Sequence, residues 1–141
     1  MSNNTLLGAA LFSAGLILAV SIPGSAQAQG GGRVFELRTY TAAEGKLEAV
    51  VARFRNHTVK LFEKHGITNI GYWVPQDEPL SRNTLIYIVA HKSREAAKKS
   101  WEAFRNDAEW IRVRNESEAG GKLVIKVESV FMGPVDFSRL K

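Results

Sequence analysis

The chain contains no cysteine and only four prolines among its 141 residues. The absence of cysteine excludes a disulfide scaffold, a thiolate zinc site and a cysteine nucleophile. Hydrophobic residues make up 45% of the sequence and charged residues 23%, a balance typical of a globular chain and too apolar for a disordered one. The length suits a single ordinary domain, so its stability must come from packing or from association.

Charge is missing from the first 28 residues, although the whole chain carries a net charge of +5. Residues 6–20 form an apolar run, a Pro-Gly breaker follows, and the small-x-small pattern of a processing site ends at Ala28. This pattern predicts a secretory signal peptide over residues 1–28, cleaved after Ala28, and export to the bacterial periplasm or the medium. Because residues 1–5 contain no Lys or Arg, an uncleaved N-terminal anchor is the alternative. The run is shorter than the roughly 20 residues that span a bilayer, so the cleaved chain is not expected to insert stably in a membrane.

Residues 29–32 form a Gly-rich flexible linker, and we interpret residues 33–141 as one domain without repeats. Its acidic and basic residues are interleaved, which favours a solvated surface over a nucleic-acid interface. The sequence contains no GxGxxG, P-loop or GxSxG motif, which argues against nucleotide, flavin and serine-hydrolase sites.

The hydrophobic period changes several times along this domain. Four segments are predicted strands because they alternate or are rich in β-branched and aromatic residues: residues 33–41, 67–74, 83–92 and 122–131. Two segments have the helical period, residues 44–65, which Gly66 ends, and residues 94–114, which Ser93 caps. The order β-α-β-β-α-β is that of the ferredoxin-like α+β fold, in which two helices cover one face of a four-stranded antiparallel sheet.

The third predicted strand is apolar on both faces, so we expect the second face of the sheet to be covered as well. One set of its residues is expected under the helices and the other on the opposite face: Thr84, Ile86, Ile88 and Ala90 in the first, Leu85, Tyr87 and Val89 in the second. A second copy of the chain is the simplest cover. The sequence therefore predicts a homodimer in which two sheets face each other as a dimeric α+β barrel.

Short motifs spread over nearly the whole mature chain carry a family resemblance: residues 36–40, 65–66, 71–73, 128–130 and 136–138, together with Ser93, Trp101, Phe104, Asp107, Glu109 and Trp110. With these motifs the chain resembles the NIPSNAP family of the dimeric α+β barrel group. The resemblance implies the fold and the dimer. It implies no particular chemistry, because NIPSNAP proteins have no agreed catalytic activity. Ala108 stands where the family usually has proline, so the helix break implied there is expected to be softer. Related barrels, such as antibiotic-biosynthesis monooxygenases, use the cavity between sheet and helices, which directs attention there.

Strand phase predicts a set of side chains that point into the barrel interior: Glu36, Arg38, Tyr40, Tyr87 and His91, followed by Lys126 and Glu128. Arg38 has two interpretations. It satisfies Glu36 or Glu128 as a buried ion pair at the dimer interface, which is the commoner role of a buried charge. Alternatively it binds a carboxylate or enolate oxygen of a ligand, with Tyr40 or Tyr87 supplying a neutral hydrogen bond.

The three histidines lack the spacing of metal ligands, so no metal site is expected. His57 and His65 are about 12 Å apart along a helix. His65 ends the first predicted helix, where bonds to backbone carbonyls are its expected role. A haem needs only one axial histidine, so haem is the one alternative to a chain without cofactor. Trp110 lies off the apolar stripe of its helix and marks a helix break after Asp107, a dimer contact or the mouth of a ligand pocket.

Three functions remain open at this point. The first is binding of a small apolar or aromatic molecule in the cavity, by residues drawn from Glu36, Arg38, Tyr40, Tyr87 and Trp110. The second is a cofactor-independent monooxygenase or isomerase in the same pocket, with His65 or His91 as the base and Arg38 steadying an anion. The third is a structural protein-interaction module, which would show an apolar patch outside the dimer interface.

Overall fold

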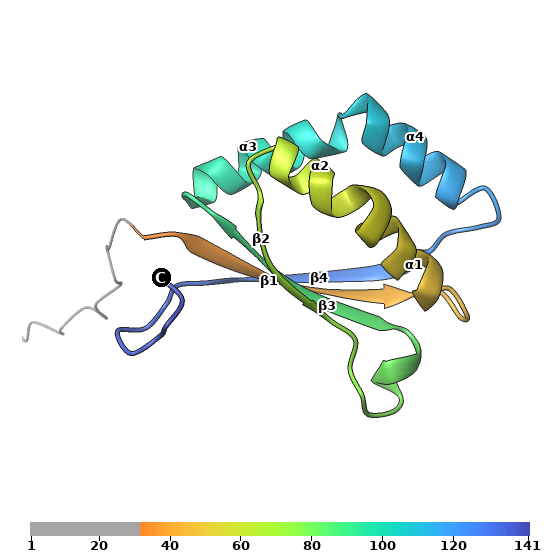
Figure 1. Ribbon diagram of the computed structural model, residues 1–141, viewed down its shortest axis with the longest axis horizontal. Helices are drawn as coiled ribbons and strands as arrows, with labels where there is room; N and C mark the ends of the chain where they lie inside the picture. The colour runs from red at the N-terminus through yellow and green to blue at the C-terminus, as the bar shows by residue number, and fades with distance from the viewer. Residues whose placement is uncertain (1–31) are drawn as a thin grey trace, which may run out of the picture.

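The computed structural model describes residues 32–141, so the predicted signal peptide and most of the linker lie outside the described residues. The elements follow in chain order: β1 Val34–Ala42, α1 Leu47–Arg53, η1 Phe54–Thr58, α2 Val59–Lys64, β2 Thr68–Trp73, η2 Leu80–Arg82, β3 Thr84–His91, α3 Arg94–Arg105, α4 Ala108–Ser117 and β4 Val124–Met132. The strands form one antiparallel sheet in the order β2-β3-β1-β4, and α1 to α4 cover one face of it (Figure 1). The predicted α+β fold with its ferredoxin-like order is thereby confirmed. No helix among the described residues is long and apolar enough to cross a membrane.

The first helical segment contains a wider turn that the sequence did not predict. Expected as one helix over residues 44–65, it is α-helical in α1, π-helical in η1 and α-helical again in α2. In the π turn the buried Thr58 hydroxyl donates to the carbonyl of Arg53 at 3.3 Å. The segment ends as expected at Gly66, whose φ of +74° favours glycine.

The second helical segment is broken, which corrects the prediction of one helix over residues 94–114. Ser93 caps α3 by accepting from the Ala96 N–H at 3.0 Å, as expected. Asp107 then leaves the helical conformation, with ψ at 126°, and its carboxylate caps α4 by accepting from two backbone N–H groups. Helix α4 therefore begins at Ala108 even though no proline follows the aspartate, because the carboxylate satisfies the free amides of a new helix.

The two faces of the sheet are the reverse of those expected for β3. The register pairs Glu36 with Val89 and Arg38 with Tyr87, so these side chains share one face. That face is the helix face, because Glu36 bonds to Trp101 of α3 and Tyr87 packs on rings of η1 and α2. Ile86 and Ile88 lie on the opposite face. Both faces of the strand are apolar, so periodicity could not distinguish them.

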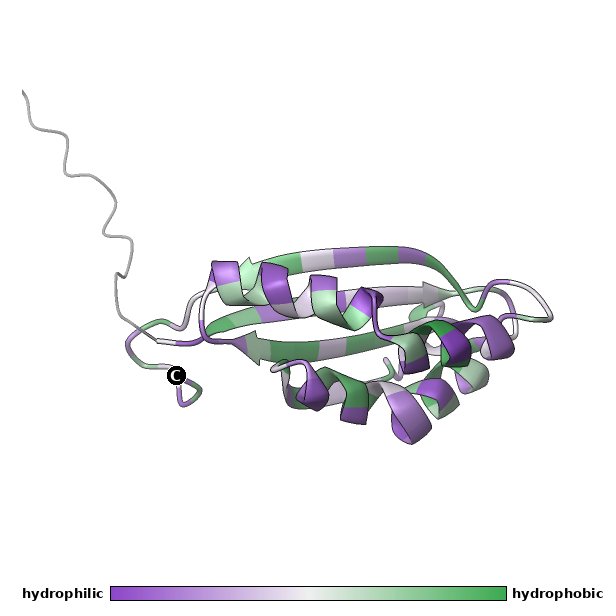
Figure 2. Ribbon diagram, turned by 90° about the horizontal axis from the view of Figure 1, so that it is seen from above, coloured by the Kyte–Doolittle hydropathy of each residue, from purple (hydrophilic) through white to green (hydrophobic). Residues whose placement is uncertain are grey.

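The core lies between the helix face and the helices and is dominated by aromatic side chains. Phe62 contacts Trp101 and Phe104 edge-on, with ring centroids 5.2 and 4.9 Å apart. Phe54 from the π turn packs on Tyr87, which is fully buried. Edge-to-face packing of this kind stabilises a core beyond the area it buries. Seen from above, hydrophobic stretches run along the strands, while the outer sides of the helices carry many hydrophilic residues (Figure 2).

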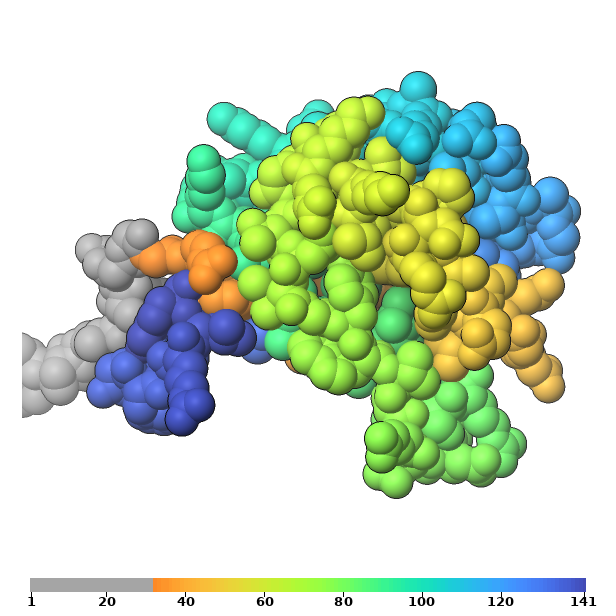
Figure 3. All heavy atoms as spheres, viewed as in Figure 1, coloured from red at the N-terminus to blue at the C-terminus, as the bar shows by residue number. Residues whose placement is uncertain are grey.

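The second face, which we call the open face, has no helix on it in the described chain. Trp73 and Val130 on this face are 51% and 56% exposed. Trp73 lies flat over Gly71, since a Cβ at residue 71 would come within 2.5 Å of the indole. The C-terminal residues 133–140 fold against one end of this face, where Pro134 and Leu140 border a cleft of about 230 Å³ with Phe35. Figure 3 shows this tail beside the beginning of β1.

Candidate functional site

Glu36 is the centre of a polar cluster on the helix face and is only 1% exposed. One carboxylate oxygen, Oε2, bonds to Trp101 Nε1 at 2.7 Å and His91 Nε2 at 3.0 Å. The other, Oε1, accepts from Ser129 Oγ at 2.5 Å and Arg38 Nη1 at 3.0 Å. A buried carboxylate with a full set of donors is held firmly, because each donor compensates for water that the carboxylate has lost.

The donors around Glu36 outweigh its burial. Burial alone would raise the pKa of Glu36, since it disfavours the charged form. The bonds from His91, Ser129 and Trp101, together with the charge of Arg38, instead lower that pKa from 4.5 to about 2. With Glu36 ionised, His91 donates its Nε2–H to the carboxylate. Glu36 is therefore a stable buried anion and does not exchange a proton near neutral pH.

Arg38 is the cation of this cluster. Its Nη1 pairs with Glu36, and its guanidinium carbon lies 4.2 Å from the ring centroid of Trp101, a cation–π contact. Although burial opposes its charge, the neighbouring Tyr87, Tyr40 and Glu36 raise the pKa of Arg38 further. Its Nε is buried and has no acceptor among residues 32–141. The ion pair predicted for Arg38 therefore exists with Glu36, on the helix face, whereas Glu128 lies on the open face, where it pairs with Lys126.

Tyr87 faces Arg38 on the adjacent strand and carries a second unpaired donor. Its ring stacks on Tyr72 at 5.2 Å and meets Tyr40 edge-on at 5.3 Å. The Tyr87 hydroxyl is buried and makes no hydrogen bond of standard geometry in the described part of the chain. Burial raises the pKa of Tyr87 well above its ordinary value, and Tyr40 raises it further through its charge and a hydrogen-bond interaction of poor geometry, so the phenol stays protonated and can donate to a better-placed acceptor.

Arg38 and Tyr87 together form an incomplete site for an oxygen atom. Both groups are donors, they occupy facing positions of β1 and β3, and each affects the pKa of the other. A carbonyl or carboxylate oxygen is the acceptor that such a pair recognises. Tyr40 and Tyr72 are partly exposed beside Tyr87, and a small opening between β2 and the α1–α2 segment exposes the inner strands to view (Figure 3).

The histidine candidates are held by carboxylates. His91 is 2% exposed and bonds to Glu36, while its Nδ1 is buried without a partner among the described residues. His65 Nε2 lies 2.8 Å from Asp107 Oδ2, so its partner is the cap of α4 rather than the backbone carbonyls expected. Hydrogen bonds from Lys64 and His65 hold the pKa of Asp107 well below its usual range. His65 therefore links the end of α2 to the start of α4. It shares no hydrogen bond with the Glu36 cluster.

Trp110 lies in the packing between helices. It follows the break at Asp107, as one interpretation of its position required, and its ring packs 4.6 Å from that of Phe104. Two members of the Glu36 cluster were missed as site residues, Trp101 and Ser129. Trp101 has the spacing of a core residue, and it also donates a hydrogen bond to Glu36. The only sequence signal for this second role is that a buried Glu36 must find donors. No group of three or more potential metal ligands occurs in residues 32–141.

Comparisons with known proteins agree with this architecture. A NIPSNAP family protein of unknown function from Agrobacterium tumefaciens superposes with a TM-score of 0.68 at 21% identity, covering 79% of this chain and 96% of that one. An uncharacterised NIPSNAP-like domain protein from Burkholderia xenovorans gives 0.66 at 16% identity, covering 77% and 90%. A monooxygenase from Streptomyces coelicolor, solved with the ligand nanaomycin D, gives 0.55 at 13% identity, covering 79% and 95%. At these identities the likeness shows the fold.

The family model gives the more specific result. No curated protein matches the chain. The family model for NIPSNAP, in contrast, matches residues 35–139, which include every helix and strand described here apart from Val34 at the start of β1. The chain belongs to the NIPSNAP family.

Proposed function

We propose that this chain binds a small molecule between its sheet and its helices, with Arg38 and Tyr87 donating hydrogen bonds to an oxygen of the ligand. The observation that carries the proposal is the pair of buried donors without acceptors, Arg38 Nε and the Tyr87 hydroxyl, on facing strand positions. An unsatisfied buried polar group costs about 1–3 kcal/mol. A ligand oxygen that accepts from both groups would remove this cost, so binding is favourable at this place.

The neighbouring rings indicate the body of the ligand. The rings of Tyr40, Tyr72 and Phe54 surround Tyr87, each with its centroid 5.2 or 5.3 Å from that of the Tyr87 ring. Aromatic walls of this kind favour a flat apolar or aromatic molecule. We therefore infer an aromatic carbonyl or carboxylate compound, in which the ring packs on the tyrosines and the oxygen meets Arg38 and Tyr87.

Binding fits the geometry better than turnover. A general base needs a nitrogen that can reach a proton of the substrate. The three catalytic candidates already interact with carboxylates: His65 with Asp107, and both His91 and Arg38 with Glu36. His65 is bonded to Asp107 outside the Glu36 cluster, and the free ring nitrogen of His91, Nδ1, is buried in a residue only 2% exposed, so neither imidazole is open to a substrate proton as the chain is folded.

The tyrosines provide a direct test, because the chain has only three and all lie around the proposed site. In a spectrum of protein with ¹³C-labelled tyrosine, acetophenone and benzoate should shift the Tyr87 and Tyr40 ring signals. Ethylbenzene, which has a similar body without oxygen, is the matched control and should bind more weakly. Tyr87→Phe should weaken acetophenone binding by about tenfold.

Tyr72→Phe is the control variant for this test, since the Tyr72 hydroxyl donates to Asn69 and not to the proposed ligand. It should leave acetophenone binding nearly unchanged. Equal shifts from ethylbenzene and acetophenone, no shift from any of the three probes, or no effect of Tyr87→Phe would each refute the proposed site.

We further propose that a second copy of the chain covers the open face. Trp73 and Val130 expose apolar surface there, and a two-fold axis would bring the same patch of two copies together. Trp73→Glu should shift the chain from dimer to monomer in analytical ultracentrifugation. Ile111→Glu, at an exposed apolar position of α4, should leave the dimer intact. A monomeric wild type, or a Trp73→Glu dimer of unchanged affinity, would contradict this.

Export remains part of the proposal, because residues 1–28 have the pattern of a signal peptide. The intact mass of protein recovered from a bacterial periplasm should begin at Gln29. A chain that keeps Met1 and stays with the membrane would favour the N-terminal anchor instead.

A further inference from the structure

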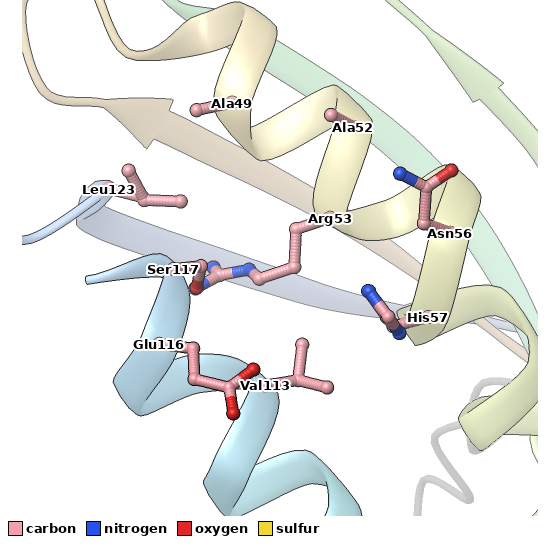
Figure 4. A pocket seen from close by; sticks show the side chains of 9 residues that line it. All are labelled: Ala49, Ala52, Arg53, Asn56, His57, Val113, Glu116, Ser117 and Leu123. Atoms are coloured by element: carbon pink, nitrogen blue, oxygen red, sulfur yellow. The ribbon is translucent and has the colours of Figure 1, made fainter. Parts of the chain in front are cut away.

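A cavity lies outside the Arg38–Tyr87 site, between the first and the second helical segments (Figure 4). This cleft, the α1–α4 cleft, has a volume of about 400 Å³, within the usual range for small-molecule sites. Its apolar lining comes from Ala52 of α1, Val113 of α4 and Leu123 just before β4. Its polar lining includes Arg53, His57 and Glu116.

Arg53 places a buried positive charge in this cleft. The side chain is only 4% exposed, and Figure 4 shows it reaching from α1 toward Ser117 of α4. Its Nη1 donates to Ser117 Oγ at 3.2 Å and to Glu118 Oε1 at 3.0 Å. Its Nε is buried without an acceptor, and its Nη2 makes no hydrogen bond within residues 32–141. A guanidinium has five N–H donors, so most of the capacity of Arg53 is unused.

The π turn brings a second donor to the same cleft. Residues Phe54–Thr58 are π-helical, a rare geometry that is found often at functional sites. His57 lies in this turn and lines the cleft on the side away from Ser117 (Figure 4). No hydrogen bond ties the imidazole of His57 to another part of the described chain, unlike His65 and His91. It is therefore free to bond to a ligand.

The acidic groups near Arg53 leave room for an anion. Glu118 is the ion-pair partner of Arg53 and is 25% exposed at the edge of the cleft. Glu116 pairs with Arg112 at 2.7 Å, one turn earlier on the solvent side of α4. Glu116 is thus paired by another arginine, and Glu118 occupies only the Nη1 group of Arg53, which leaves Nε and Nη2 without an acceptor in residues 32–141. The other polar side chains of the lining are Arg53, whose Nε has no acceptor among residues 32–141, then His57, Asn56 and Ser117, the last of which already accepts from Arg53.

We propose that the α1–α4 cleft is a binding site for a small monocarboxylic acid. The carboxylate is held by the free N–H groups of Arg53, because a guanidinium presents them in the geometry of a carboxylate, and His57 borders the same ligand from the side of the cleft away from Ser117. The hydrocarbon part of the acid packs on Ala52, Val113 and Leu123. The site is separate from Arg38 and Tyr87, and the inference does not rest on the function proposed for that pair.

The histidines allow a selective test, because the chain has only three and one of them lies in the cleft. The experiment uses the processed chain, residues 29–141, with ¹³C-labelled histidine. Hexanoate and benzoate are titrated and followed by NMR, with hexanamide and benzamide as uncharged controls. Hexanoate or benzoate should shift the His57 signal and leave those of His65 and His91 in place. The matching amide should bind at least about tenfold more weakly, because it lacks the charge that Arg53 recognises.

Two variants make the test specific. Ala52→Leu fills the cleft without touching the Arg53–Glu118 pair and should abolish the His57 shift. Ala103→Leu makes the same change at an exposed position of α3 outside the cleft and should leave the shift unchanged. Loss of the His57 shift in Ala52→Leu, with tyrosine signals that still respond to acetophenone, supports a site independent of Tyr87.

The proposal is overturned by any of three results: no His57 shift with either acid, equal binding of acid and amide, or an unchanged shift in Ala52→Leu. A shift that Tyr87→Phe removes while Ala52→Leu preserves it would assign the acid to the Arg38–Tyr87 site and would likewise overturn the cleft.

Discussion

Two arginines in this chain, the buried Arg53 and the partly buried Arg38, have nearly the same local geometry and different surroundings. Arg38 and Arg53 each pair through Nη1 with a glutamate at 3.0 Å, and each has a buried Nε without an acceptor in the described chain. Each also lies over a tryptophan ring, Trp101 at 4.2 Å and Trp110 at 5.2 Å. The two arginines differ in the surroundings of their glutamate partners.

Glu36 is buried and accepts from three further donors, whereas the carboxylate of Glu118 is partly exposed and accepts only from Arg53 among residues 32–141. The first pair is part of a closed network, and removing one member leaves several buried groups unmatched. The second pair lies at the edge of an open cleft, where water can replace either partner. Arginine burial alone is therefore a poor guide to energetic importance; the surroundings of the carboxylate decide it.

The largest expected effect comes from removing the charge of each glutamate. Glu36→Gln should lower the free energy of unfolding by about 3 kcal/mol, because it leaves the partly buried Arg38 without a counter-charge and the donors around residue 36 without a charged acceptor. Glu118→Gln should lower it by less than about 1 kcal/mol, since its pair is partly hydrated. Urea unfolding followed by tryptophan fluorescence measures both values. Equal losses in the two variants would break the comparison.

A pH series should show the same contrast with a smaller effect. The folded-state pKa of Glu36 is about 2 against 4.5 for the free side chain. The stabilisation is therefore complete above pH 4.5 and is lost as the pH falls through 4.5 toward 2, by about 3 kcal/mol at most. The free energy of unfolding of wild type and Glu36→Gln should converge over this window. Asp107 also has a lowered pKa, so the difference between the two proteins, rather than the wild type alone, isolates Glu36. Parallel curves would contradict the assignment.

The smallest effect is expected for the unpaired hydroxyl of Tyr87 in protein without ligand. Tyr87→Phe removes a buried donor that has no acceptor, so stability should stay constant or rise by up to about 1 kcal/mol. Tyr72→Phe removes a hydroxyl that donates to Asn69 and should cost about 1 kcal/mol. Thermal unfolding in parallel measures the two changes. A large loss in Tyr87→Phe would mean that its hydroxyl already has a partner.

The element order was predictable, because the change from period two to period 3.6 is strong in this sequence. The faces of the sheet were not, since β3 reads TLIYIVAH and is apolar on both sides. A second feature hides the assignment. Glu36 is charged, and only the donors from three other elements, His91, Trp101 and Ser129, make its position under the helices stable. Such long-range compensation leaves no periodic signal.

The site residues were predictable to different degrees. Strand phase grouped Glu36, Arg38, Tyr40, Tyr87 and His91 correctly on one face, although on the helix face rather than the one expected. It was wrong to add Lys126 and Glu128, which lie on the open face. Arg53 could not be found from sequence, because its partner Glu118 is 65 residues away. The π turn that places His57 in the cleft likewise has no sequence signal that we recognise, since its stripe of apolar residues continues the helical period.

Native mass spectrometry of the chain recovered from a bacterial periplasm tests the central claim most directly. The account predicts a dimer of chains beginning at Gln29 that carries a small molecule at gentle energy and releases it at dissociating energy. The same preparation of Tyr87→Phe should carry much less of it, and that of Tyr72→Phe the same amount as wild type. Wild-type protein without any bound molecule, or a molecule retained equally by Tyr87→Phe, would contradict binding at Arg38 and Tyr87.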